Sequence, residues 1–494
     1  PYYVCAGLLL LVVALQLYRG SSVAWWVYAA FLLATLAWSL WEVGLDWWGL
    51  AARADAFFLV GLLLITPWVA RRLVHPLPQA PAPAGESRQR GNLGWRNGRG
   101  ALALVLALTL GVGAVSGVVD LHSTQGSLPG VRGAPEAASA DRMPPGEWHA
   151  YGRTGHGQRY APLAQINVEN VSELQEAWHF HTGDLRGQPG DPVETTFQVT
   201  PLKVGDHLFL CTPHQSVIAL DATTGQQLWR FDPKIQSGLA LQHLTCRGLS
   251  YWSNDGSTPV ATSAATTPAT SQTGLAAPEL PVAARDSATT DTCPRMLYMP
   301  TADGRVIALD PQTGQVCSTF GGGTGQINLW QGMPNVRLGG YYSTSPVIAS
   351  QRVLVVGGTV LDNVSTTEPS GVVRGFDVQS GALLWHWDPG RPDDNSPLQP
   401  GQTYTASSPN VWSVMSVDEA LGLVYLPMGN PPPDQWGGKR SEAAERVGSS
   451  VVALDLATGR LRWLFQTVHH DLWDYDVPSQ PTLVDLTIDG TTVP

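Results

Sequence analysis

The stretch Ala-Leu-Asp-Ala-Thr-Thr-Gly at residues 219–225, followed by Trp229, sets a pattern that returns three times. The later copies lie at 308–314, 375–381 and 453–459, and are followed by Phe320, Trp385 and Trp463. Each copy predicts a strand that ends in Asp, a turn closed by Thr/Ser-Gly and a second strand, which together form a hairpin. Repetition of one hairpin predicts a β-propeller whose aromatic rings pack between neighbouring blades. Unrelated β-sandwich hairpins, the alternative, would not reuse the same turn.

The number of copies is small for a closed ring. There are four copies, or five if residues 178–183 are the degenerate start of another copy. Because a ring usually needs more blades, we expect that further blades follow Pro494. Pro1 is not an initiator methionine and directly precedes a predicted span, so we also expect an upstream segment. Residues 146–494 are therefore interpreted as part of a propeller.

The apolar residues are concentrated in the first 120 of the 494 positions. Four segments there are nearly free of charge and predict membrane spans: 2–17, 23–40, 56–70 and 101–119. The connection at 71–100 is rich in Arg, so the positive-inside rule predicts that it is cytoplasmic. We expect a multi-pass anchor of about four helices in the bacterial inner membrane, with the propeller in the periplasm.

The charge balance excludes one class of function. The chain has 29 basic and 40 acidic residues, a net charge of −11, and its lysines are only Lys203, Lys234 and Lys439. A nucleic-acid binder needs a basic face, so we expect no nucleic-acid partner.

A Trp-rich stretch at 38–48 lies at the expected outer membrane interface. Trp rings commonly anchor helices at this level. A pocket for a lipid-soluble quinone is the alternative, because Glu42 and Asp46 beside the rings are costly at membrane level unless they are used. Both interpretations stay open on the sequence.

Two segments have the composition of connections rather than of packed structure. Residues 121–145 are rich in Gly, Ala, Ser and Pro and predict a linker, and residues 253–292 predict a low-complexity surface insertion. Cys246 and Cys293 flank this insertion and form a candidate disulfide, although the pairing does not follow from sequence and free thiols are equally compatible.

The sharpest chemical signal is His-His-Asp-Leu-Trp-Asp-Tyr-Asp at residues 469–476, which follows the last hairpin. These side chains could cap turns, but a carboxylate beside an aromatic ring that excludes water is also a suitable general base. Two further clusters lie at 359–363, with Glu368 nearby, and at 428–433. Their Asp and Asn oxygens suit Ca²⁺ or Mg²⁺, whereas single Asp and Asn residues at strand ends are more often turn residues.

Longer motifs resemble the membrane-bound quinoprotein glucose dehydrogenases, which use pyrroloquinoline quinone (PQQ). They extend over nearly the whole chain and lie at 41–46, 151–167, 177–178, 242–248, 407–412 and 466–474. The resemblance implies an eight-bladed propeller that holds PQQ on its axis, oxidises glucose or another aldose at C1 to the lactone, and passes electrons to ubiquinone in the lipid bilayer.

The same resemblance assigns roles residue by residue. Asp474 resembles the proton acceptor and lies at the cofactor, and Trp412 resembles the ring on which PQQ stacks. Asp362 and Asn363 resemble the metal-binding position, and Asn430 matches the Gly-Asn-Pro form of the related alcohol dehydrogenases. His243 matches a position near the sugar, where a structural histidine is the alternative.

The chain also departs from the family. A lysine beyond the Asp474 segment that contacts the cofactor has no counterpart before Pro494, so we expect the fragment itself to be inactive. Two other functions stay open: a PQQ-dependent alcohol or polyol dehydrogenase, and a non-catalytic propeller scaffold of the cell envelope. The scaffold has no need for Trp412, Asp362 and Asp474 together.

Overall fold

The computed structural model describes residues 2–74, 98–119, 143–254, 277–286, 288–290, 293–488 and 491–493. The chain divides into two compact units, Pro1–Gly133 and Ala134–Pro494. The predicted linker lies almost wholly outside the described residues, as do most of the predicted insertion and most of the Arg-rich connection.

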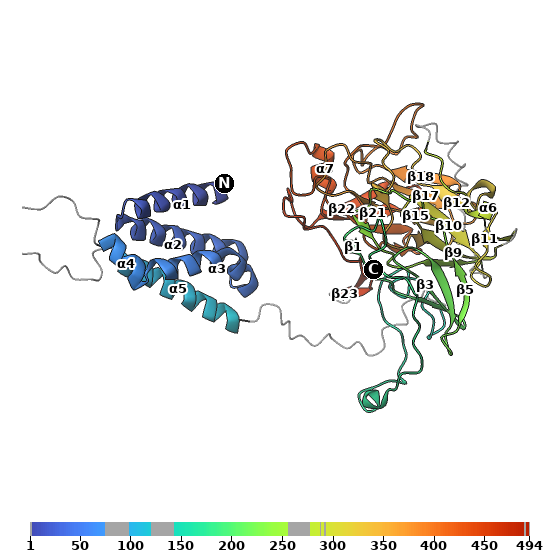
Figure 1. The fold of residues 1–494 in the computed structure, drawn as a ribbon, viewed down its shortest axis with the longest axis horizontal. Coiled ribbons are helices and arrows are strands. Elements are labelled where there is room, and N and C mark those ends of the chain that lie inside the picture. The colour runs from blue at the N-terminus through green and yellow to red at the C-terminus, as the bar shows by residue number, and fades with distance from the viewer. Residues whose placement is uncertain are drawn as a thin grey trace, which may run out of the picture. The chain divides into compact units, whose positions relative to one another are not determined.

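The first unit is helical in its described part (Figure 1). Its helices are α1 (Tyr2–Tyr18), α2 (Val23–Val43), α3 (Trp47–Leu64), α4 (Pro67–Val74) and α5 (Arg99–Val118). Helix α2 contacts α1, α3 and α5, and its Trp25 is fully buried and donates from Nε1 to the carbonyl of Leu64 at 2.9 Å. Helices α2 and α5 are long and apolar enough to cross a membrane, and Val4–Tyr18 is a shorter apolar helix.

The bounds predicted for the third span, 56–70, are wrong. Helix α3 begins earlier, at Trp47, and ends at Leu64, and α4 begins at Pro67. Proline lacks the N–H that a helix interior needs and its ring clashes with the preceding turn, whereas it suits the first turn of a new helix. Pro67 therefore divides the apolar stretch, and α3 instead includes the more polar residues that precede position 56.

Both carboxylates of the Trp-rich stretch have partners within the helical unit. Glu42 Oε2 lies 2.6 Å from Arg53 Nε, and the Arg53 guanidinium lies 5.7 Å from the ring centroid of Trp38. Asp46 Oδ1 accepts a hydrogen bond from the N–H of Gly49 at the start of α3, at 3.3 Å. An ion pair and a helix cap account for these carboxylates without a bound quinone.

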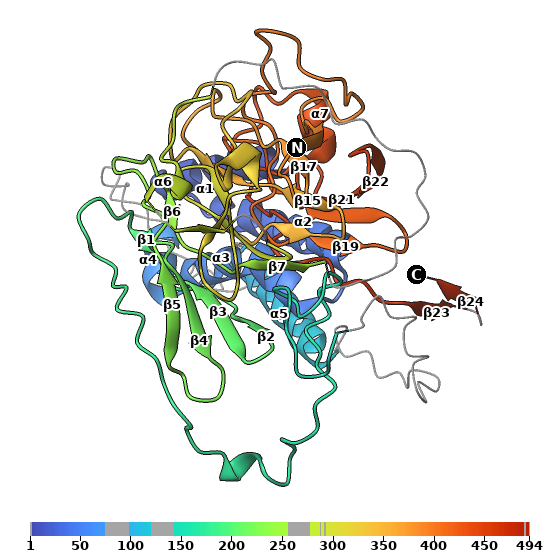
Figure 2. The ribbon, with the colours of Figure 1, turned by 90° about the vertical axis from the view of Figure 1, so that its right-hand side faces the viewer.

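The second unit consists mainly of antiparallel sheets. The first sheet contains β2 (Leu202–Val204), β3 (His207–Cys211), β4 (Val217–Asp221) and β5 (Gln227–Phe231), side by side in Figure 2. The second contains β7 (Ser250–Ser253), β9 (Arg295–Pro300), β10 (Arg305–Leu309), β11 (Val316–Cys317), β8 (Thr289–Thr290) and, paired with β10, β12 (Gln326–Asn328). The third contains β14 (Ile348–Ala349), β15 (Val353–Val356), β17 (Val373–Asp377) and β18 (Leu383–Trp387). The fourth contains β19 (Ser416–Asp418), β20 (Leu423–Pro427), β21 (Ser450–Asp455) and β22 (Leu461–Gln466).

Short elements join these sheets. The two-stranded pairs are β1 (Glu194–Thr195) with β6 (His243–Leu244), β13 (Tyr341–Tyr342) with β16 (Thr359–Val360), and β23 (Leu486–Ile488) with β24 (Thr491–Val493). The helical turns are η1 (Val171–Glu173), α6 (Ala283–Asp286), η2 (Gly321–Gly323) and α7 (Glu442–Val447).

The predicted hairpins are confirmed. Strand pairs β4–β5, β10–β11, β17–β18 and β21–β22 carry the four repeats. In each turn the Asp side chain accepts hydrogen bonds from the chain that follows; Asp377 Oδ1, for example, accepts from Ser380 N at 2.8 Å and Ser380 Oγ at 2.7 Å. Short local bonds of this kind explain why the same Asp-x-x-Thr/Ser-Gly sequence gives the same turn each time.

The aromatic residue of one repeat packs on the turn of the next. Trp229 Nε1 donates to the carbonyl of Pro311 at 3.1 Å, and a Cβ on Gly314 would lie 2.6 Å from the Trp229 ring. Trp385 repeats this arrangement: a Cβ on Gly459 would lie 2.4 Å from its ring. The turn glycines are therefore needed both for their positive φ and for the close approach of the ring.

Each large hydrophobic cluster of this unit draws on two consecutive sheets. One joins β3 and β4 to β9 and β10, the next joins β9 and β10 to β15 and β17, and the third joins β15 and β17 to β20 and β21. Sheets that bury both faces against their sequence neighbours form blades, so the propeller prediction is confirmed. Four such sheets fall within the described residues, and the expected total of eight stays a prediction.

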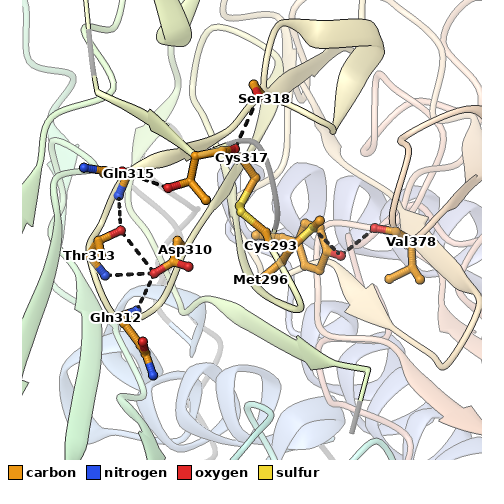
Figure 3. Close-up of a disulfide and its surroundings, with 11 residues drawn as sticks. Cys293, Met296, Asp310, Gln312, Thr313, Gln315, Cys317, Ser318 and Val378 are labelled. Carbon is orange, nitrogen blue, oxygen red and sulfur yellow. Dashed lines mark hydrogen bonds between the residues drawn. A yellow bond between two sulfur atoms is a disulfide. The ribbon is translucent and has the colours of Figure 1, made fainter. Parts of the chain in front are cut away.

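The predicted Cys246–Cys293 disulfide is wrong. Cys246 is bonded to Cys211 and Cys293 to Cys317, each with a Cα–Cα distance of 6.0 Å. Figure 3 shows the second bond beside the Asp310 turn. Cys293 comes directly before β9 and Cys317 ends β11, so strand pairing within one sheet brings them together across 24 residues of sequence.

Candidate active site

Loops from several sheets converge on one polar cluster. Residues 242–247 precede β7, residues 361–363 follow β16, residues 410–412 precede β19, residues 428–434 follow β20 and residues 471–476 follow β22. Hydrogen bonds between these loops, described below, place the sequence-predicted residues near one another.

The loop 471–476 is shaped by its first residue. Asp471 is 2% exposed, and it accepts hydrogen bonds from Trp473 N at 2.9 Å, Tyr475 N at 2.7 Å and Ser449 Oγ at 2.7 Å. Its carboxylate is thus fully used by the loop, as the turn-capping interpretation predicted for this motif. It leaves the other carboxylates of the motif available for other roles.

Asp474 has a strained backbone and an uncommitted carboxylate. Its φ is +66°, in the left-handed region that few non-glycine residues adopt, and none of the described residues donates a hydrogen bond to its side chain. Burial, followed by the charges of Asp362 and Asp471, raises the pKa of Asp474. A half-buried carboxylate with raised basicity and a free lone pair can accept a proton from a substrate.

Asp476 holds Trp412 and Asn430. Its Oδ2 accepts from Trp412 Nε1 and its Oδ1 accepts from Asn430 N, both at 2.6 Å. Burial raises the pKa of Asp476 to about 6 even though both hydrogen bonds lower it. Trp412 therefore contacts the acidic loop through Asp476 and not through Asp474.

The half-buried ring of Trp412 lies next to a cation. The Arg247 guanidinium lies 5.3 Å from the ring centroid, and its Nη1 donates to Thr344 Oγ1 at 2.5 Å. Burial lowers the pKa of Arg247, and among the described residues no carboxylate forms an ion pair with it. An aromatic platform beside an unpaired guanidinium suits a flat, negatively charged ligand.

His243 and Asp362 are brought together. Asp362 Oδ2 accepts from Gln242 Nε2 at 2.8 Å and lies 4.0 Å from His243 Nε2, while His243 Nδ1 lies 2.5 Å from Glu194 Oε2. The nearby carboxylate of Asp362 is the main cause of the raised pKa of His243, ahead of the opposing effect of burial. Glu194 and His243 are also register partners of the β1–β6 pair, so the strand pairing fixes this contact.

The two asparagines connect loops. Asn363 Oδ1 accepts from Gln435 N at 2.9 Å. Asn430 is 1% exposed, and its Nδ2 donates to the carbonyl of Asp434 at 3.3 Å while its Oδ1 accepts from Ser449 Oγ at 3.3 Å. Both side-chain oxygens therefore already accept one hydrogen bond and keep one further lone pair each for a cation.

A further carboxylate, Asp434, lies in this cluster. It is 2% exposed, and its Oδ1 has no hydrogen-bond partner. Burial and then the charges of Asp362, Asp476 and Asp474 raise its pKa well above the usual range. Asn410 Oδ1 is a second buried oxygen without a partner.

These residues fit PQQ and a divalent cation. Trp412 and Arg247 offer a surface for a planar anionic cofactor, and the unpartnered buried oxygens of Asp434 and Asn410 are acceptors that a cation or a ligand donor would satisfy. No three His, Cys, Asp or Glu side chains within the described ranges are arranged to hold a metal ion by themselves. A cation here would therefore also need amide or cofactor oxygens.

Sequence reasoning missed Asp434, Asp476 and Arg247 as site residues. Each lies next to or inside a motif that was singled out: Asp434 follows the triple proline after Asn430, Asp476 ends the acidic motif, and Arg247 follows Cys246. Their proximity to the motifs was a signal, but burial and contact with Trp412 and Asp362 are not visible in the sequence.

Comparisons with known proteins identify the family of the chain. Residues 148–494 match the family model "Glucose/ethanol/alcohol dehydrogenase, beta-propeller domain". A quinoprotein glucose dehydrogenase of Escherichia coli (strain K12) is 43% identical over 491 residues, 99% of this chain and 55% of that protein. Quinoprotein glucose dehydrogenase A of Acinetobacter calcoaceticus is 42% identical over 497 residues, 100% of this chain and 57% of that protein.

The chain spans about half the length of these curated relatives. A solved structure of a europium-containing methanol dehydrogenase aligns with a TM-score of 0.50 and 23% identity, covering 71% of this chain and 54% of that one, which supports the fold alone. With the family model matched over 148–494, the chain belongs to the PQQ-dependent glucose/ethanol/alcohol dehydrogenase family of β-propellers.

Proposed function

We propose that the protein is a membrane-anchored PQQ-dependent dehydrogenase that oxidises glucose or another aldose at C1 to the lactone. The observation that carries the proposal is that the Asp474 carboxylate accepts no hydrogen bond from the described residues and that its backbone has a positive φ. Asp474 lies in the same loop cluster as Trp412 and Asp362. An ordinary turn aspartate, such as Asp377, instead accepts hydrogen bonds from its own turn, through Oδ1.

PQQ supplies the two-electron oxidation when it is bound. Asp474 takes the proton of the sugar hydroxyl, for which its raised basicity is suited. Asp476 fixes the indole of Trp412 by accepting from Nε1, so that the cofactor platform cannot rotate. Arg247 faces the platform as a counter-charge for the anionic cofactor.

Asp362, Asn363 and Asn430 are the residues proposed to hold Ca²⁺ or Mg²⁺, and a cation held there would supply Lewis-acid polarisation of the cofactor. His243 is proposed to lie at the sugar, oriented by Glu194 through its Nδ1. The side chains of His243 and Glu194 are partly exposed, at 31% and 63%, which leaves this side of the cluster open to a substrate.

The helical unit is proposed to be a multi-pass anchor in the bacterial inner membrane, with the propeller in the periplasm and ubiquinone as the electron acceptor. Two helices long and apolar enough to span a bilayer support the anchor. The positive-inside rule applied to the Arg-rich connection supports the orientation.

The experiment is quinone-analogue reduction by glucose, with the detergent-solubilised protein, PQQ and Ca²⁺ or Mg²⁺. We expect D474N to lower kcat/KM by about 10²–10⁴-fold while PQQ still binds, because the general base is lost. The control D310N changes a hairpin aspartate to a residue that supports the same turn, and it should keep parental activity. A parent that oxidises no aldose, alcohol or polyol at saturating PQQ and cation would contradict the proposal.

A second candidate is oxidation of an alcohol or polyol. The Gly-Asn-Pro sequence at Asn430, buried at the centre of the cluster, is the observation that favours it. Glycerol and primary alcohols in the same assay separate the two, since the preferred substrate has the larger kcat/KM.

A further inference from the structure

Asp434 is a buried carboxyl group in the loop cluster that the proposed roles leave unused. It is 2% exposed and its Oδ1 has no partner. A buried carboxylate is normally paired with a cation or satisfied by donors, because an unsatisfied one loses its hydration without compensation.

The neighbours of Asp434 do not supply that compensation. The charged side chains that raise its pKa, after burial, are the carboxylates of Asp362, Asp476 and Asp474. The nearest guanidinium, that of Arg440, donates from Nη1 and Nη2 to the carbonyls of Asp471 and Asp434, at 2.6 and 2.7 Å, and forms no ion pair with the Asp434 carboxylate. Carboxylates crowded without donors repel one another unless a positive charge lies between them.

The backbone holds Asp434 in this position from several sides. Asn430 Nδ2 and Arg440 Nη2 both donate to the Asp434 carbonyl. The backbone N–H of the next residue, Gln435, donates to Asn363 Oδ1. The last bond ties the loop after β20 to the loop after β16, which carries Asp362. The loops therefore hold the backbone of Asp434 close to the loop that carries Asp362.

We propose that Asp434 is a direct ligand of the divalent cation, opposite Asp362, and that these two carboxylates supply the negative charge of the site. The inference rests on the proposed function, because it assigns a ligand to the cation of that function. Asn363, whose oxygen holds Gln435 N, then acts mainly by positioning Asp434. Two carboxylates with amide and cofactor oxygens form the oxygen-only set that Ca²⁺ or Mg²⁺ prefers.

Titration calorimetry of the detergent-solubilised protein with Ca²⁺, and separately with Mg²⁺, tests this, each with and without PQQ. We expect D434N and D362N each to weaken cation binding at least tenfold. D393N is the matched control: it also removes one negative charge, but from a side chain that is 70% exposed and paired with Arg446, and it should bind the cation like the parent.

Stability provides a second readout. If Asp434 binds the cation, the parent should gain thermal stability when the cation is added, and D434N should lose most of that gain. Without cation, D434N should be at least as stable as the parent, because it removes an unsatisfied buried acid. Should D434N fail to fold, the smaller D434S removes the same charge and takes its place.

The outcomes separate the inference from the proposed function. A parent that binds the cation while D434N binds it within twofold of the parent overturns the inference and leaves the dehydrogenase proposal intact. A parent that binds neither cation, even with PQQ, overturns the inference together with the cation of the proposed function. Loss of cation affinity in D434N and D362N but not in D393N supports it.

Discussion

Aspartate has two different roles in two regions of the propeller unit. In the hairpin turns, Asp377 and its counterparts accept hydrogen bonds from nearby residues of the same turn. For Asp377 the donors lie two and three positions further along the chain. In the loop cluster, Asp362, Asp434, Asp474 and Asp476 come from three loops, and the charges of the other three raise the pKa of Asp434. Local bonds lower the pKa of the turn residue Asp221, whereas burial raises the pKa values of Asp474 and Asp476.

This difference shows how to separate structural from chemical aspartates. A carboxylate that is satisfied by its own turn contributes to folding and has no free lone pair in a protected place. A carboxylate that the tertiary structure places next to other carboxylates destabilises the folded state through charge repulsion. Such an arrangement is typical of functional sites. Beyond the loss of activity expected for D474N, substitutions of Asp476, Asp377 and Asp221 test the distinction, and Trp385→Ala tests the packing of the blades that carry these aspartates.

The largest expected effect on stability comes from the packing between neighbouring blades of the propeller. Trp385→Ala should lower the free energy of unfolding by about 3–5 kcal/mol, because the ring is 6% exposed, packs on Gly459 and donates to the carbonyl of Leu456. Trp463→Ala is the matched control, since Trp463 occupies the same repeat position but is 44% exposed. Denaturant unfolding should show the smaller loss for Trp463→Ala, and equal losses would contradict this account of blade packing.

The next effect distinguishes two acids of the same loop. Asp476→Asn should lower the free energy of unfolding by about 1–3 kcal/mol, because the amide has one acceptor for two donors, Trp412 Nε1 and Asn430 N. Asp474→Asn, which meets no donor, should leave stability unchanged or raise it. Thermal unfolding of both variants checks this, and the reverse order of stability would assign the structural role to Asp474.

A hairpin aspartate should behave in the opposite manner to Asp474. Asp377→Ala should destabilise the protein by about 1 kcal/mol, because three local hydrogen bonds are lost. Dehydrogenase activity of the folded fraction should not change. A large loss of kcat in Asp377→Ala at full folding would show that the turns are not purely structural.

The smallest effect is a pH dependence. Hydrogen bonds from Thr224 lower the pKa of Asp221 in the folded state, so its stabilising contribution is present above the unfolded value of about 3.9 and is lost as pH falls through the lower folded value. The stability difference between the parent and Asp221→Asn should therefore shrink as pH is lowered from 7 to 3. A difference that grows on acidification would contradict the lowered pKa.

Much of the fold could be predicted from the sequence. The hairpin turns are held by hydrogen bonds within three or four residues, so each Asp-x-x-Thr/Ser-Gly copy is enough to predict its own turn. Helix α2 begins at Val23, as predicted. The bounds of the third segment were wrong, because its apolar composition gave no sign that the helix ends before Pro67. The disulfides could not be predicted, because strand pairing and not sequence separation decides which cysteines meet.

The candidate site was predictable only in part. Trp412, Asp474 and His243 lie in long motifs, Asp362 and Asn430 lie in shorter polar clusters, and resemblance assigned a role to each of them. Asp434 and Asp476 were missed as site residues, although Asp476 is two residues from Asp474. Their significance lies in contacts over 46 to 72 residues of sequence, such as Asn430 with Asp476 and Asn363 with Gln435.

The sequence by itself determined the repeated hairpins, the apolar helical segment and the membership of a family, because these depend on local bonds, composition and motif. Only the tertiary structure decided which carboxylates face one another, which cysteines pair and which acid holds Trp412. Those properties depend on loops from separate blades that burial and interblade packing bring together, and neither effect is encoded in any short stretch of the chain.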